Sequence, residues 1–74
     1  MPAKLHINGA AFDLPEEADF ADLTQLLLTA FQENKATTVQ VEADSKPLLL
    51  IINPTQIPYI ALDQDGTWIG FHSG

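Results

Sequence analysis

The chain has 74 residues with ten carboxylates, three lysines and no cysteine, which gives it a formal net charge of −7. This length allows a single domain, residues 1–74. The absence of cysteine excludes disulfides and thiolate metal sites, and the charge argues against nucleic acid or an anionic membrane as a partner, because both attract clustered basic residues.

The same composition limits where the protein is expected to work. Crossing a membrane takes about 20 consecutive apolar residues, which the chain lacks, and its first residues do not follow the pattern of a signal peptide. We therefore expect a cytoplasmic protein without membrane contact. The acidity either keeps a small protein soluble or selects a basic partner, and composition leaves both alternatives open.

The first predicted element is a β-hairpin. Asn8-Gly9 lies between alternating apolar residues, a combination that strongly favours a two-residue hairpin turn with arms at 3–8 and 10–14. The two-residue period of a strand places Lys4 and His6 on the face opposite the apolar side chains of the first arm.

A helix is predicted next. The acidic segment after the hairpin suits a helix start, with Asp19 as the N-cap or with Asp13 or Leu14 as an earlier boundary. The helix should run to about Glu33, with Asn34 as a left-handed stop. Its apolar stripe is predicted to comprise Phe20, Leu23, Leu27, Ala30 and Phe31, with Leu26 and Leu28 on the flanks.

The remainder predicts four strands, at 37–42, 48–52, 57–62 and 67–72, separated by polar turns. Pro58 has no N–H to donate, which predicts an edge position or a bulge for its strand. Gly70 indicates a bulge or the close approach of another backbone. The fold class is therefore α+β, with one helix packed on a mostly antiparallel sheet of five or six strands in the order β-β-α-β-β-β-β.

The segment Leu48–Ile52 is the most informative of these strands. It has five consecutive apolar residues, whereas a half-exposed strand would alternate, so it is predicted to be central in the sheet or covered on both faces. A single helix covers one face only. The side chains left for an interface are predicted to be Leu49, Ile51, Ile60 and Trp68.

Motifs for catalysis or metal binding are weak. His6 and His72 could approach each other if the first and last strands were neighbours, but a zinc site needs more ligands than two. Asp63-Gln64-Asp65-Gly66 resembles the start of a calcium loop, but it is better explained as a hairpin turn. We expect no catalytic residue, no metal and no cofactor.

The segment at residues 4–27 resembles the opening of the β-grasp sulfur carriers of thiamine and molybdopterin synthesis. The resemblance rests on Ile7-Asn8-Gly9, Leu14-Pro15 and Ala21-Asp22-Leu23, and residues 63–74 resemble the last hairpin of those proteins. It implies a β-grasp-like fold and a carrier activated at Gly74, although Ser73 stands where the carriers have glycine. The chain also resembles short uncharacterised bacterial proteins that begin with Leu-x-Ile-Asn-Gly, and that resemblance implies no activity.

Three functions remain as expectations. The first is a non-enzymatic protein-interaction module that forms a homodimer through an apolar sheet face. The second is a carrier of sulfur or acyl groups activated at its C-terminal glycine. The third is an acidic inhibitor, similar to immunity proteins or antitoxins, that occupies a basic partner.

Overall fold

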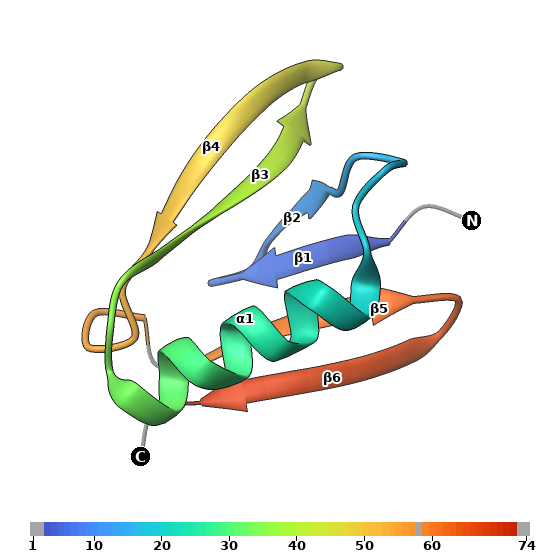
Figure 1. The fold of residues 1–74 in the computed structure, drawn as a ribbon. Helices are drawn as coiled ribbons and strands as arrows, with labels where there is room; N and C mark the ends of the chain where they lie inside the picture. The colour runs from blue at the N-terminus through green and yellow to red at the C-terminus, as the bar shows by residue number, and fades with distance from the viewer. Residues whose placement is uncertain (1–2, 58, 73–74) are drawn as a thin grey trace.

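The computed structural model describes residues 3–57 and 59–72, and in these it has one helix and six strands (Figure 1). The α+β prediction and the predicted order of elements are confirmed. The elements are β1 (Lys4–Ile7), β2 (Ala10–Asp13), α1 (Phe20–Glu33), β3 (Thr37–Ala43), β4 (Lys46–Ile52), β5 (Tyr59–Gln64) and β6 (Thr67–His72).

The six strands form one sheet in the order β4-β3-β2-β1-β5-β6, and every neighbouring pair is antiparallel. The helix α1 packs on one face of this sheet, which we call the inner face. Figure 1 shows the β3–β4 hairpin extending away from α1 towards its turn. A single residue pair, Asp13 opposite Glu42, joins β2 to β3, so the hairpin is attached to the other four strands through a narrow junction.

The ends of α1 lie where the sequence predicts. Asp19 is the N-cap, and its Oδ1 accepts hydrogen bonds from the backbone N–H groups of Ala21 at 2.9 Å and Asp22 at 3.2 Å. Asn34 ends the helix with a φ of 53°. Both caps satisfy backbone groups that the helix itself cannot pair.

The core lies between α1 and the inner face. The helix contributes Leu27, Ala30 and Phe31, and the ring of Phe31 lies 6.1 Å from that of Phe71 on β6, measured between centroids. Leu26 and Leu28 are exposed on the flanks of the helix, as predicted. The buried cluster comprises Leu5, Leu14, Leu27, Phe31, Val39, Val41, Ile52, Ile60, Leu62 and Phe71.

Three of the strand connections are two-residue turns with positive φ at both positions, as type I′ turns require: Asn8-Gly9, Asp44-Ser45 and Asp65-Gly66. Two of these turns place glycine second. The third places Ser45 there, at a φ of 63°, where an L side chain is strained. The β3–β4 hairpin therefore closes on the least favourable of the three turns.

The structure contradicts one alternative of two sequence expectations about the strands and the whole of a third. Residues 48–52 are not central, because β4 forms an edge of the sheet. The strand after Pro58 is not an edge, because β5 lies between β1 and β6; Pro58 itself is outside the described residues. Gly70 sits in regular register opposite Ala61, and the atoms nearest the position of a Cβ are those of the Tyr59 side chain, not another backbone.

The strained turn gives a test of this description. We expect Ser45→Gly to raise the free energy of unfolding by about 0.5–1 kcal/mol, because glycine removes the left-handed penalty but adds freedom to the unfolded chain. Gly66→Ser should lower it by a similar amount, since no atom lies within 4 Å of the Cβ position there and only the backbone conformation opposes the change. Urea titrations of the two variants against the wild type measure both effects, and a destabilised Ser45→Gly would contradict the turn assignment.

Candidate functional site

The free edge of β4 carries the most exposed large aliphatic side chains among the described residues. Leu49 is 63% exposed and Ile51 is 73% exposed. They lie opposite Gln40 and Thr38 of β3, so all four side chains point to the outer face, away from α1. The structure leaves Leu49 and Ile51 exposed, and their place in an interface stays a prediction.

The backbone of β4 is also open on this side. Ala43 and Lys46 close the two-residue turn, so they form a hydrogen-bonded pair, and bonding to β3 then alternates along β4. The N–H and C=O groups of Leu49 and Ile51 therefore point to the free edge. Pro47 also falls in this outward set, so its missing N–H costs the β3–β4 ladder no hydrogen bond.

Natural edge strands are usually shortened, charged or bulged to prevent pairing with another chain. β4 has seven residues and pairs with β3 without a bulge, and its only charged residue is Lys46 at the turn end. Pro47, beside Lys46, blocks only that end. The segment 48–52 is therefore an apolar edge without a bulge, and its outward groups can accept another strand.

The four predicted interface residues do not form one surface. Ile60 is fully buried, and naming it as an interface residue was wrong. It lies opposite Ile7 of β1 and Phe71 of β6, and the side chains of all three residues are on the inner face, towards α1. Trp68 is 56% exposed, but it lies on β6, the edge of the sheet opposite to β4.

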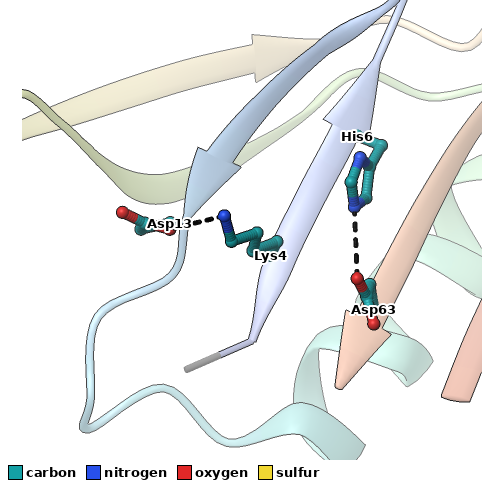
Figure 2. Close-up of polar contacts among 4 residues, drawn as sticks. All are labelled: Lys4, His6, Asp13 and Asp63. Atoms are coloured by element: carbon teal, nitrogen blue, oxygen red, sulfur yellow. Dashed lines mark hydrogen bonds and ion pairs between the residues drawn. The ribbon is translucent and has the colours of Figure 1, made fainter. Parts of the chain in front are cut away.

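A second feature of the outer face is a row of charged side chains. Strand pairing places Glu42, Asp13, Lys4 and Asp63 side by side across four strands, followed by Trp68 on β6. Lys4 Nζ lies 3.7 Å from Asp13 Oδ1 (Figure 2). The row thus holds three carboxylates for one ammonium, and its two acids at the β2–β3 junction stand directly opposite each other.

Trp68 belongs to a small aromatic cluster at the end of this row. The imidazole of His6 stacks on its indole with 4.2 Å between ring centroids and 27° between planes. His6 Nε2 also lies 3.4 Å from Asp63 Oδ2 (Figure 2). His6 is on β1 and Trp68 on β6, so their side chains meet across β5.

Small residues on β5 and β6 make this stack possible. Ala61 pairs with His6 on one side and with Gly70 on the other, and Ala61 is buried although it lies on the outer face. The ring of Tyr59, 54% exposed, occupies the space beside Gly70, where an added Cβ would lie 3.0 Å from its Oη. We call His6, Tyr59, Asp63 and Trp68 the Trp68 patch. Neither Tyr59 nor His6 was predicted to lie on this surface, because their positions beside Gly70 and Trp68 depend on pairing between strands that are distant in sequence.

The first and last strands are not neighbours, because β5 lies between β1 and β6, and the imidazole of His6 is stacked on Trp68. The described residues contain no group of three or more histidine and acidic side chains placed to hold a metal ion. Within the same residues α1 is the one helix, and its 14 residues are too few to cross a membrane.

No protein-family model, curated protein or solved structure matches this chain. The resemblance to the β-grasp sulfur carriers therefore stays a prediction. Gly74, the terminus on which that alternative depends, is outside the described residues. The case for a function rests on the geometry of the β4 edge and of the Trp68 patch.

The opposed carboxylates at the junction provide a test of the outer face. Like charges directly opposite in a sheet destabilise it, so Glu42→Gln should raise the free energy of unfolding by about 0.5 kcal/mol at low ionic strength. The gain should shrink at about 1 M salt, where charges are screened within about 3 Å. Glu16→Gln, the same neutralisation in an exposed loop, is the control. An equal gain from both variants would mean that net charge, and not the Asp13–Glu42 pair, causes the effect.

Proposed function

We propose that the protein is a non-enzymatic interaction module that self-associates by pairing β4 with β4 of a second copy. The supporting observation is the free edge of β4, whose outward backbone groups and exposed aliphatic side chains lie on the same stretch of strand. Adding a strand to an exposed sheet edge is a common mode of recognition, in which the main chain supplies affinity. The product would be a continuous antiparallel sheet through two copies.

The outward groups favour one register. In an antiparallel pair centred on Leu50, Leu49 of one copy lies opposite Ile51 of the other, and each such pair exchanges two hydrogen bonds. The two-fold axis repeats the pair, giving four hydrogen bonds and four apolar side chains packed together on the outer face. This register also leaves Pro47, which has no N–H, outside the central pairs.

The expected affinity is moderate. Leu49 and Ile51 start about two-thirds exposed, and burying four such side chains contributes on the order of 6 kcal/mol. Four backbone hydrogen bonds add about 4 kcal/mol in total. Association costs at least about 4 kcal/mol in lost translation and rotation. The balance predicts a dissociation constant in the micromolar range, not the nanomolar range.

A cytoplasmic location is part of this proposal. It is supported by the absence of cysteine, which fits a reducing compartment. Homodimerisation would also suit a domain of 74 residues, since so small a core is marginal in stability and gains from burial against a second copy.

The decisive variant is Ile51→Lys. A lysine on an edge strand is a natural device against pairing, and this side chain is exposed, so the fold should be retained while the dimer is lost. We expect sedimentation velocity to show a concentration-dependent dimer for the wild type between about 1 and 300 µM, and a monomer for Ile51→Lys throughout.

Thr67→Lys is the matched control. It adds the same charge at an exposed position on β6, at the far edge of the sheet, and should dimerise like the wild type. Far-UV circular dichroism and thermal unfolding of dilute samples should be alike for all three proteins. A wild type that stays monomeric over the whole range, or an Ile51→Lys variant that still dimerises, contradicts the proposal.

A further inference from the structure

We propose that the Trp68 patch binds an arginine side chain presented by a basic protein, with its guanidinium stacked on Trp68 and paired with Asp63. This site lies on β5 and β6, whereas self-association uses β4 at the opposite edge of the sheet. The inference therefore does not rest on dimerisation, and the two can fail separately.

Trp68 is 56% exposed even though His6 stacks on its indole, so the residue can be reached from solvent. His6 stacks on one side of the ring at 4.2 Å, which fixes the orientation of the ring. More than half of the side chain nevertheless remains exposed. A cation placed over an indole is attracted by the negative charge on its face, and arginine is found in this position more often than lysine.

Asp63 supplies the anion beside that ring. It lies directly opposite Trp68 in the β5–β6 pair, where Cβ atoms of paired residues are about 5 Å apart. Its side chain is 22% exposed, so it can be reached from solvent while being partly shielded. A flat guanidinium can stack on the indole and still direct its N–H groups at the carboxylate, which a compact ammonium cannot do equally well.

The charge of the surrounding face favours a basic protein as the source. The cross-strand row that ends at Trp68 has three carboxylates and one lysine, and that lysine contacts only one of the two opposed acids, Asp13. Over the whole chain the formal charge is −7, which repels phosphate backbones and anionic lipids. A bound basic segment would lower the repulsion within the row and add to the rate of association.

Trp68 is the only tryptophan of the chain, so its fluorescence reports on this site alone. The probe is a Gly-Arg-Gly-Arg-Gly peptide, and its counterpart with citrulline keeps the shape of the side chain but removes the charge. We expect saturable quenching by the arginine peptide, at least about tenfold weaker binding of the citrulline peptide, and weaker binding as salt is raised.

Two neutralising variants locate the contact. Asp63→Asn should weaken binding of the arginine peptide at least about tenfold, because the paired carboxylate is lost. Asp65→Asn makes the same change of charge two residues away in the turn, where asparagine suits the positive φ, and should alter binding less than about twofold. Ile51→Lys, which is designed to remove the dimer, should bind the peptide as the wild type does.

Three results would overturn the inference. These are the absence of saturable binding by the arginine peptide, equal binding of the citrulline peptide, and equal effects of Asp63→Asn and Asp65→Asn. The citrulline comparison uses the unaltered protein, so it decides the matter even if Asp63→Asn disturbs the His6–Trp68 stack. Failure here with an intact concentration-dependent dimer would remove the arginine site and leave self-association standing.

Discussion

The width of a single helix limits how much of this sheet can be covered. An α-helix with its side chains is about 10–12 Å across, whereas six strands at about 4.8 Å spacing span roughly 24 Å. α1 therefore covers only part of the inner face, and the described residues place no element on the outer face. Leu48 shows the consequence: it shares the inner register with the buried Val41, yet it remains exposed because it lies beyond the helix.

The β3–β4 hairpin carries the apolar residues that this arrangement leaves uncovered. It joins the other strands through one pair of residues, and those residues, Asp13 and Glu42, carry like charges. Its turn uses a strained serine, and its free strand is apolar on both sides. Each feature weakens the hairpin in an isolated copy. A second copy paired along β4 would cover the exposed side chains and satisfy the outward backbone groups, which is why we place the interaction there.

Local chemistry made much of the fold predictable from the sequence. The Asn8-Gly9 turn, the Asp19 cap and the left-handed Asn34 each depend on residues within a few positions of one another, and all three are confirmed. The position of β4 was not predictable in the same way. A strand that is apolar on both faces has the same hydrophobic periodicity whether it is buried in the centre of a sheet or exposed at its edge. Periodicity therefore cannot distinguish the two positions.

The candidate site also has a part that local sequence could predict and a part that depends on strand pairing. Leu49 and Ile51 could be assigned to one face because the two-residue side-chain period of a strand is local. The burial of Ile60 depends on its pairing with β1 and β6, which turns its side chain towards α1. The Trp68 patch needs four residues from three strands, brought together by registers that no single segment encodes. Gly70 was the available signal: a glycine inside a strand marks a close approach, which here is made by the ring of Tyr59.

The most direct test of edge pairing is amide hydrogen exchange along β4 at low and high protein concentration. In a single copy the N–H groups of Leu48 and Leu50 bond to β3, while those of Leu49 and Ile51 face solvent. If β4 pairs with β4 of a second copy, the Leu49 and Ile51 amides exchange freely in dilute solution and become protected as concentration rises, while Leu48 and Leu50 are protected throughout. If a dimer forms and the Leu49 and Ile51 amides still exchange freely, β4 is not the interface.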